Sequence, residues 1–459
     1  ANFLLSSNIR NKIKKIKKKN KVFNLKHQST IINNLKFNLT IDQTKALEKI
    51  NNDMKSKQKM FRLLQGDVGS GKTIVSVIAA LNAVKAGYQV AIMAPTEILA
   101  NQHYKYIINN FKKYCNSEIL TGKTEYRQRK KILNDLLNKK IDVLIGTHAL
   151  FQNKITYNNL GLIIIDEQHK FGVNQRKKLS DKGGNNCDVL VMSATPIPRT
   201  MMMTIYGDMD ISLIKSKPKN RKPIKTYSKN ETKIDEVIKF IKSEILKKNQ
   251  IFWVCPLIKE SQKIDHQSAI EKYKYLSKIL KYNVDIIHGS MNKDERENVL
   301  NKFKEKKIDI LVSTTVIEVG IDFPNANVIV IENSNKYGLS QLHQLRGRVG
   351  RGESEASCIL LFKAGLSENA RKRITILKNT NDGFKVAEED LKIRGYGDIL
   401  GFKQSGLKKY NLADPLKHKD LFDLAEAHIK KIEKNNIEIV KYNKLLRLYD
   451  KVAVINDAI

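Results

Sequence analysis

Short, unbroken apolar runs recur along this chain in two series that a polar stretch separates. The first series lies between about residues 37 and 215 and consists of FRLLQ, VAIMAP, DVLIGT, LGLIIID and VLVMSAT. The second consists of IFWVCPL, VDIIHGS, IDILVSTT, NVIVIEN and CILLF. Runs that are apolar throughout, rather than at alternate positions, are typical of strands buried on both faces of a parallel sheet. The sequence therefore predicts the α/β class, with two tandem parallel-sheet domains.

The segments between and beyond these runs set the expected domain boundaries. The first 36 residues carry many lysines and no acidic residue, which predicts a basic tail or the remnant of something removed. KSKPKNRKP, at residues 215–223, is polar and contains proline, as is typical of a linker. The strand signal stops after Ala364, and the remainder is helical in pattern, polar and basic. The expected parts are a tail at 1–36, a first domain at 37–217, a second at 218–364 and a helical C-terminal extension at 365–459.

The composition narrows the class of protein. A length of 459 residues suggests two or three domains. The formal net charge of +36 points to a polyanion such as nucleic acid, although the lysine-rich composition of an AT-rich genome explains the charge equally well. None of the four cysteines forms a CxxC pair, which argues against zinc or a disulfide framework and fits a reducing, intracellular setting. No apolar run approaches the ~18 residues of a membrane span.

The motif with the most specific pattern is GDVGSGKT, at residues 66–73, which fits G-x-x-x-x-G-K-[ST]. It follows an expected strand and precedes an apolar helical stretch, the context in which such a loop wraps phosphates with its backbone N–H groups. Lys72 is expected to reach the β- and γ-phosphates of a nucleotide, and Thr73 to ligate Mg²⁺. The candidate nucleotide-binding residues are Gly66, Gly69, Ser70, Gly71, Lys72 and Thr73.

A pair of acidic residues follows another expected strand, in LIIIDEQH at residues 162–169. The carboxyl ends of parallel strands meet at one edge of a sheet, where ligands bind. With a phosphate-binding loop in the same domain, Asp166 is expected to hold the metal through water. Glu167 is expected to polarise the attacking water, so both acids and Lys72 are candidate catalytic residues.

The second domain contributes an arginine-rich motif, RGRVGRG, at residues 346–352. Its spacing predicts that Arg348 and Arg351 lie on adjacent turns of one helix face. An arginine can stabilise charge on a transferring γ-phosphate, and one that reaches a nucleotide on the other domain would make ATP an agent of domain closure. A nucleic-acid or surface charge patch is the alternative, and the residues alone leave the two open.

Taken together, the motifs resemble in their order those of superfamily 2 helicases and translocases, which have two RecA-like domains. More narrowly, they resemble the helicase portion of the RecG family of branched-DNA translocases, over roughly residues 37–406. The motifs that carry the resemblance are LLQGDVGSGKT, MAPTEILANQH, DEQHKFGVNQR, SATPIPRT, YGDMDIS, VCPLIKES, IHGSMNKDER, TTVIEVGIDFPNA and GLSQLHQLRGRVGRG. Among these, DEQH, YGDMDIS and VCPLIKES are the narrowest.

The resemblance implies three further groups of nucleotide contacts. One segment reads adenine, one box faces the γ-phosphate, and one box links the nucleotide state to the second domain. These groups are, in turn, Phe37 and Gln43; Gln344, Arg348 and Arg351; and Gly320 and Asp322.

The resemblance also implies a path for DNA, along which backbone N–H groups and short hydroxyls grip phosphates without reading the sequence. The residues that match this path are Pro95, Thr96, Glu97, Gly146, Thr147 and Thr314. Ser193, Ala194 and Thr195 match a box that couples hydrolysis to movement.

The stretch at residues 381–406, NDGFKVAEEDLKIRGYGDILGFKQSG, matches no phosphate or metal pattern. Phe384, Ala387 and Leu391 form the apolar stripe of one helix. Gly395 is placed to end it, and a second short helix can begin at Asp398. A helical hairpin that simply packs on the second domain explains this pattern.

The resemblance implies instead that this hairpin and the loop after it convert domain closure into DNA movement. Arg394 and Gln404 then become coupling residues. Glu388 and Asp390 are expected to brace arginines near residues 346–351.

As a whole, the resemblance implies an ATP-dependent DNA translocase or helicase that acts on branched DNA, such as replication forks and Holliday junctions, in recombination and repair. It implies ATP and Mg²⁺ as cofactors, and sequence-independent DNA and a single-stranded-DNA-binding protein as partners. It further implies a monomer in the bacterial cytoplasm, associated with the nucleoid, with an organelle left open.

One departure from the family concerns the start of the chain. The first 36 residues are too few for the wedge domain that the family carries ahead of its motor. Fork specificity is therefore left open. The alternatives are a non-catalytic DNA-binding relic and an RNA helicase with the same core.

Overall fold

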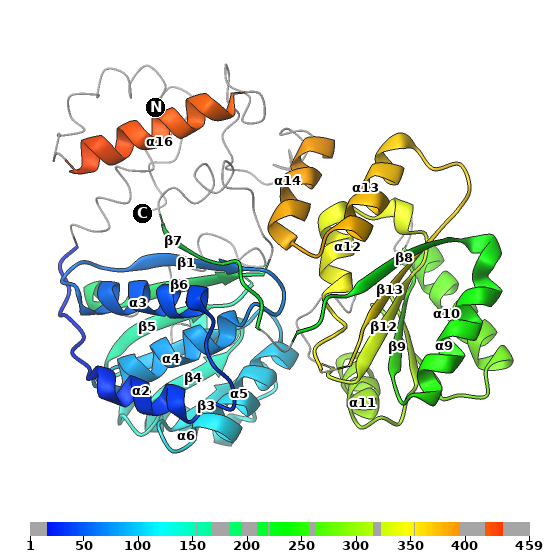
Figure 1. Cartoon of the computed structure of the whole chain (residues 1–459). Helices are drawn as coiled ribbons and strands as arrows, with labels where there is room; N and C mark the ends of the chain where they lie inside the picture. Colours follow the sequence, from blue (N-terminus) through cyan, green and yellow to red (C-terminus); the bar gives the residue numbers. More distant parts are fainter. Residues whose placement is uncertain are drawn as a thin grey trace. The chain divides into compact units, whose positions relative to one another are not determined.

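The computed structural model describes residues 16–152, 155–167, 184–194, 209–218, 221–256, 262–314, 323–352, 354–394 and 418–434. The chain divides into two compact units. Unit 1 comprises Ala1–Ser216 and Arg394–Ile459, and unit 2 comprises Lys217–Ile393. The division falls in the segment at 215–223, where the sequence predicts a linker. Each unit is built on a parallel sheet, which confirms the predicted fold class (Figure 1).

Unit 1 contains a seven-stranded sheet in the order β3-β4-β2-β5-β6-β1-β7, and the pairings between neighbouring strands are parallel. The strands are β1 (Phe61–Gly66), β2 (Gln89–Met93), β3 (Ser117–Leu120), β4 (Val143–Gly146), β5 (Leu160–Ile165), β6 (Asp188–Ser193) and β7 (Asp210–Ile214). The five predicted strands form the interior of this sheet. The sequence does not predict β3 and β7, because both are edge strands with half-exposed positions.

Helices and loops cover both faces of this sheet (Figure 1). One face packs against α2 (Leu25–Asn33), α3 (Ile41–Lys55), α4 (Lys72–Lys85) and α5 (Glu97–Phe111). The other packs against α6 (Tyr126–Leu137) and against Ala149, Leu150, Ile155 and Tyr157. Successive strand residues point to opposite faces, so Leu64 belongs to the first core and Leu63 to the second. This burial on both faces explains why the strands are apolar throughout.

Unit 2 contains a six-stranded parallel sheet in the order β10-β11-β9-β12-β13-β8. The strands are β8 (Lys225–Asn230), β9 (Gln250–Val254), β10 (Val284–Ile287), β11 (Ile310–Ser313), β12 (Ala326–Ile331) and β13 (Ser357–Phe362). One face packs against α9 (Ile234–Leu246) and α10 (Gln262–Ile279). On the other, Phe303 of α11 (Lys293–Lys304) stacks with Phe252 of β9. The sequence does not predict β8, because this edge strand is polar and largely half-exposed.

Unit 2 continues to Ile393, past residue 364, where the sequence predicts the end of the second parallel-sheet domain. Beyond β13, α13 (Glu368–Asn379) packs against β8 and against α12 (Leu339–Arg346). Arg346 holds this packing by donating to the carbonyls of Leu377 and Thr380, at 2.7 and 2.8 Å. The next helix, α14 (Gly383–Arg394), ends at the boundary of the unit, and the last described helix is α16 (Lys419–Lys434).

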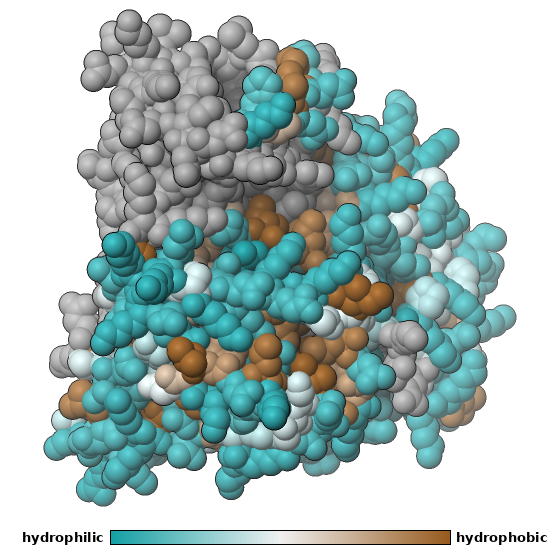
Figure 2. All heavy atoms as spheres, turned by 60° about the vertical axis from the view of Figure 1, so that its left-hand side comes forward, coloured by the Kyte–Doolittle hydropathy of each residue, from teal (hydrophilic) through white to brown (hydrophobic). Residues whose placement is uncertain are grey.

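Hydrophilic residues predominate on the face shown in Figure 2, and smaller hydrophobic groups lie between them. This surface suits contact with water and with charged partners, whatever the origin of the lysine-rich composition. None of the helices in the described part of the chain combines the length and the apolar character needed to span a membrane.

Residues 16–36, which the sequence predicts to be a basic tail or a remnant, belong to unit 1 and contribute Phe23 and Ile31 to its core. Residues 16–23, called here the N-terminal strap, run beside the loop between α3 and β1, where Lys17 forms an antiparallel bridge with Gln58. Phe23 at the end of the strap and Ile31 of α2 are buried in the core with α3 and α4. Residues 1–15 lie outside the described residues.

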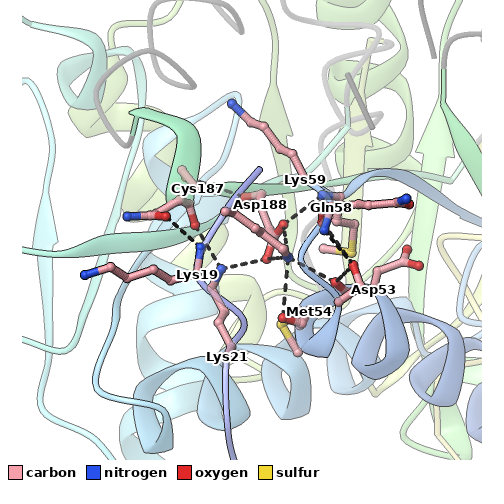
Figure 3. A network of polar contacts seen from close by, with 12 residues as sticks. Lys19, Lys21, Asp53, Met54, Gln58, Lys59, Cys187 and Asp188 are labelled. Carbon is pink, nitrogen blue, oxygen red and sulfur yellow. Dashed lines mark hydrogen bonds and ion pairs between the residues drawn. The ribbon is translucent and has the colours of Figure 1, made fainter. Parts of the chain in front are cut away.

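Two lysines of the strap are buried together with Asp188 at the start of β6 (Figure 3). Lys18 Nζ lies 2.6 Å from Asp188 Oδ1, and Lys21 Nζ lies 2.7 Å from Oδ2. Lys18 also donates to the carbonyl of Asp53 at 3.0 Å, and the N–H of Met60 donates to Asp188 at 2.8 Å. Burial lowers the pKa of Lys18, and the attraction of Asp188 only partly offsets this effect. One carboxylate thus balances two buried cations, which makes Asp188 the member on which the cluster depends most.

We expect Asp188→Asn to lower the free energy of unfolding of unit 1 by about 3–5 kcal/mol, because it leaves two buried ammonium groups without a counter-charge. Lys18→Met removes one cation and leaves Lys21 paired with Asp188, so its expected cost is smaller. Urea unfolding of the full chain measures both changes. A cost of Asp188→Asn no larger than that of Lys18→Met would contradict this account of the cluster.

Candidate nucleotide site and the segments around it

The phosphate-binding loop joins β1 to α4, which confirms the predicted order of strand, loop and helix. Helix α4 begins at Lys72 with Gly71 as its N-cap, and no side chain caps its first turn. Gly69 and Gly71 have φ angles of 72° and 81°, in the left-handed region that glycine adopts without steric cost. The N–H groups at the start of α4 are therefore available to an anion such as a phosphate.

Lys72 is folded back over this loop and is only 8% exposed. Its Nζ donates to the carbonyls of Gly66 and Asp67, at 2.7 and 3.0 Å. The buried hydroxyl of Ser70 has no hydrogen-bond partner in the part of the chain that the structure describes. Leaving a buried polar group unpaired costs about 1–3 kcal/mol, so a ligand with acceptor oxygens would relieve that cost. The residues of the loop thus fit the phosphates of ATP.

Gln43 connects α3 to the phosphate-binding loop. Its Oε1 accepts a hydrogen bond from the N–H of Thr40 at 2.8 Å, in a capping box at the start of α3. Its Nε2 donates to the carbonyl of Ser70 at 2.8 Å, and a Cβ atom on Gly71 would overlap this nitrogen. Both ends of the amide are thus used within the protein. Contact of Gln43 with adenine, and of the exposed Phe37, stays a prediction.

Asp166 and Glu167 follow β5, at the same edge of the sheet as the loop. His103 Nε2 lies 2.9 Å from Asp166 Oδ2, and the N–H of Glu167 donates to Asp166 Oδ1 at 3.0 Å. Burial tends to raise the pKa of Asp166, but the hydrogen bond and charge of His103, helped by the charge of Lys72, hold it below the usual value. Asp166 is therefore ionised at neutral pH, as a metal-binding carboxylate must be.

The surroundings of Asp166 fit Mg²⁺ better than a metal that protein side chains hold alone. Among the described residues, no group of three or more His, Cys, Asp or Glu side chains is arranged to hold a metal ion. Mg²⁺ commonly keeps several waters and takes one or two carboxylates together with substrate phosphates. Thr73, the second residue of α4, and Asp166 are the side chains that would hold it, and this assignment stays a prediction.

No function of His103 is predicted from the sequence. This residue lies on α5, within the stretch ILANQH, and is 5% exposed. Its position two helical turns after Thr96 is the signal that could have marked it. A histidine on the buried face of a helix is more often a packed core residue than a site residue, so only the distance to Asp166 distinguishes it.

Most segments predicted along the DNA path of the first domain also lie at this edge of the unit 1 sheet. They are Pro95, Thr96 and Glu97 after β2, and Gly146 and Thr147 at the end of β4. Ser193 and Ala194, which are predicted to couple hydrolysis to movement, lie at the same edge, at the end of β6. The hydroxyl of Thr96 caps α5 by accepting from the N–H of Leu99 at 3.3 Å. Their contacts with DNA stay predictions, and Thr195 lies outside the described residues.

The structure corrects the prediction that two candidate arginines share a helix face. Helix α12 ends at Arg346, and Arg348 and Arg351 lie beyond it. Gly347 is the C-cap of α12, and Gly350 has a φ of 69°, which takes the chain out of helical geometry. Arg348 is buried and Arg351 is half-buried. Their action on a γ-phosphate stays a prediction.

Arg346, which belongs to the same sequence motif, has a structural function. It is 2% exposed, and besides its bonds to α13 it lies 2.8 Å from Nδ1 of His343. The motif RGRVGRG therefore contains one arginine that fixes α12 and two that lie past its end.

The other predicted residues of unit 2 are only partly described. Gln344 is half-buried on α12. Thr314 follows β11 and is fully buried, and its hydroxyl has no partner within the described residues. Gly320 and Asp322 lie outside the described part of the chain.

The apolar stripe predicted after residue 381 is confirmed in α14. Ala387 and Leu391 are buried, and Phe384 is half-buried. Asp390 is buried as well, and its Oδ2 accepts from Ser340 Oγ of α12 at 2.6 Å. Helix α14 thus contacts the helix that precedes the two candidate arginines.

The rest of the 381–406 stretch lies largely outside the described residues. Arg394 is the last residue of α14, but its side chain is not among those described. Gly395, Asp398 and Gln404 also lie outside. The bracing of arginines by the exposed Glu388 stays a prediction, as does the coupling function of the segment.

Three family models match the chain in order. A DEAD/DEAH box helicase model matches residues 40–204, and a helicase conserved C-terminal domain model matches residues 232–353. A model for domain 3, C-terminal, of the ATP-dependent DNA helicase RecG matches residues 380–447. The third match covers the stretch at 381–406 that the sequence alone leaves between two interpretations.

The chain is similar to curated proteins named ATP-dependent DNA helicase RecG. It is 46% identical to that of Thermotoga maritima over 420 residues, which cover 91% of this chain and 54% of the relative. It is 48% identical to that of Bacillus subtilis over 386 residues, which cover 83% and 56%. The chain therefore spans about half the length of the curated relatives it matches.

Among solved structures, RecG bound to a three-way DNA junction matches with a TM-score of 0.77 and 44% identity, over 92% of this chain and 55% of that one. Mss116p bound to single-stranded RNA and AMP-PNP matches with a TM-score of 0.59 and 20% identity, over 78% and 75%, which indicates a shared fold. Given its identity to the curated relatives and the three models in order, the chain belongs to the RecG family of superfamily 2 helicases.

Proposed function

We propose that this chain is an ATP-driven motor that moves along duplex DNA and remodels branched DNA. The observation that carries this is the arrangement at one edge of the unit 1 sheet. There an uncapped helix start, Lys72 and the ionised Asp166 all follow strands of one parallel sheet. The relatives named ATP-dependent DNA helicase support ATP as the nucleotide and DNA as the polymer.

ATP would bind with its phosphates at the start of α4. The N–H groups of the first turn and the hydroxyl of Ser70 offer donors there, and the N-cap Gly71 has no side chain to bond to the helix start. Lys72 would exchange the carbonyls of Gly66 and Asp67 for phosphate oxygens. This exchange couples nucleotide binding to a change in the loop itself, because those two carbonyls lose a donor.

Hydrolysis would then depend on groups that this chain positions around the γ-phosphate. Mg²⁺, when held through Thr73 and Asp166, neutralises phosphate charge. Glu167 would orient the attacking water, and its N–H bond to Asp166 keeps the two acids in a fixed relation. Arg348 and Arg351 are the proposed cations for charge on the γ-phosphate.

DNA would contact the segments that follow β2 and β4 through backbone N–H groups and short hydroxyls. Such contacts hold phosphates without reading bases, as a motor that must step requires. The net charge of +36 supports this mode of binding, which weakens as salt rises. A relative solved as RecG bound to a three-way DNA junction supports branched DNA as the substrate.

We place this activity in recombination and DNA repair in the bacterial cytoplasm, with a single-stranded-DNA-binding protein as a further partner. This placement rests on the family resemblance. A non-catalytic DNA-binding protein and an RNA helicase are the outcomes that the experiments below separate from it.

We expect duplex DNA to stimulate ATP hydrolysis by the wild-type chain, and we expect RNA to stimulate it less. Lys72→Ala and Glu167→Gln should each reduce the stimulated rate by about 10²- to 10⁴-fold, because they remove a phosphate contact and the group that orients water. Lys85→Ala, at the exposed end of the same helix, is the matched control and should keep the wild-type rate. Equal rates in all four proteins would exclude the proposed hydrolysis. Greater stimulation by RNA would favour the RNA helicase.

Gly71→Ala should weaken nucleotide binding, because the new Cβ would displace Gln43 Nε2 and break its bond to the loop. Gly87→Ala is the control for backbone strain. Gly87 also has a left-handed φ, of 83°, but a Cβ there would meet nothing within 4 Å. The rise in melting temperature on addition of a non-hydrolysable ATP analogue measures binding. A similar rise in both variants would argue against a positioned loop.

Arg394→Ala and Gln404→Ala should keep DNA-stimulated hydrolysis and lose the movement of a branch point in a labelled Holliday junction. This is expected because the resemblance places both residues in the coupling segment. Lys392→Ala, which removes an exposed ion pair with Glu389 on α14, is the control and should move the branch normally. Loss of hydrolysis together with movement would mark the segment as purely structural.

A further inference from the structure

Helix α5 joins two parts of the proposed machinery within unit 1. It begins at Glu97 after the N-cap Thr96, in the segment proposed to contact DNA. Seven residues after Thr96 it carries His103, which contacts Asp166. At 1.5 Å per residue, these two points lie roughly 10 Å apart along one helix. A regular helix transmits a displacement of one end to the other, because its backbone hydrogen bonds resist local deformation.

The contact between His103 and Asp166 fixes the carboxylate in orientation. Because Asp166 is ionised, its Oδ2 is an acceptor and His103 Nε2 carries the proton, over the 2.9 Å that separates them. The N–H of Glu167 occupies Oδ1 from the other side. Among the described residues, each oxygen has one donor and keeps acceptor capacity for water around a metal. With His103 5% exposed, water does not readily replace the imidazole.

We infer that His103 is a positioning residue that couples DNA contact at the start of α5 to Mg²⁺-dependent nucleotide binding at Asp166. This inference rests on the proposed function, which assigns DNA to Thr96 and the metal to Asp166. DNA that draws the start of α5 toward its phosphates shifts His103 and so changes the orientation of the Asp166 carboxylate.

The inference has a consequence for binding alone, without turnover. If duplex DNA raises the affinity for a Mg²⁺-bound nucleotide by some factor, the nucleotide must raise the affinity for DNA by the same factor. Couplings of this kind are typically about 5- to 150-fold. Removing the imidazole should bring both factors toward one while leaving nucleotide binding without Mg²⁺ unchanged, because only Asp166 loses its partner.

The test measures binding of a fluorescent, non-hydrolysable ATP analogue to the full chain, with and without Mg²⁺ and with and without duplex DNA. We expect His103→Leu to weaken Mg²⁺-dependent binding by about 10- to 100-fold, as is usual when the partner of a metal ligand is lost. In this variant, DNA should no longer raise the affinity for the nucleotide, and the nucleotide should no longer raise the affinity for DNA. His103→Gln places an amide N–H near the position of Nε2 and should restore most of both effects.

Three controls separate the possible failures. The melting temperature of each variant without ligands reports whether it folds, and Asn109→Ala, at an exposed position of α5, should behave as wild type.

Asp166→Asn should itself lose Mg²⁺-dependent binding. If it does not, the metal assignment of the proposed function fails. If Asp166→Asn loses that binding while His103→Leu keeps full coupling to DNA, the inference about His103 is overturned. Equal losses in His103→Leu and His103→Gln would also overturn it, because they would indicate packing alone.

Discussion

The common edge of a parallel sheet is the constraint on which the proposed site of unit 1 depends. Every interior strand of this sheet runs in the same direction, so the residues that follow each strand emerge together. The phosphate-binding loop after β1, Asp166 after β5 and Thr96 after β2 are separated widely in sequence, yet they share one edge. The apolar strands therefore do more than form the hydrophobic core, because their direction determines at which edge of the sheet the polar site residues lie.

Opposite this edge, the sheet is held by buried charge. Asp188 begins β6, whose other end carries Ser193 of the proposed coupling box. The lysines of the N-terminal strap reach this carboxylate across about 170 positions of sequence. Lys18 also binds a carbonyl at the end of α3, the helix whose start places Gln43 against the phosphate-binding loop. The strap therefore fixes the far ends of two elements that serve the site.

The sequence predicts the parts of this structure whose signal is local. Interior strands are apolar because both their faces are covered. The loop at 66–73 can be recognised from its glycines, because its backbone has positive φ angles at Gly69 and Gly71. Edge strands such as β3 and β8 escape prediction, since half-exposed positions read as polar. The sequence pattern around Lys18 and Lys21 predicts a solvated tail, because the carboxylate that pairs with them, Asp188, is distant in sequence. Arg348 and Arg351 have the spacing of one helix face, but α12 ends at Arg346 and the positive φ of Gly350 breaks helical geometry between them.

Movement along duplex DNA is the central claim, and displacement of a triplex-forming strand tests it most directly. A labelled third strand is bound to a long duplex, and its release is followed with the full chain and ATP. We predict release that requires ATP hydrolysis and a duplex track leading to the triplex. Release that is equal with a non-hydrolysable analogue, or no release while ATP is being hydrolysed on the same duplex, would contradict the account.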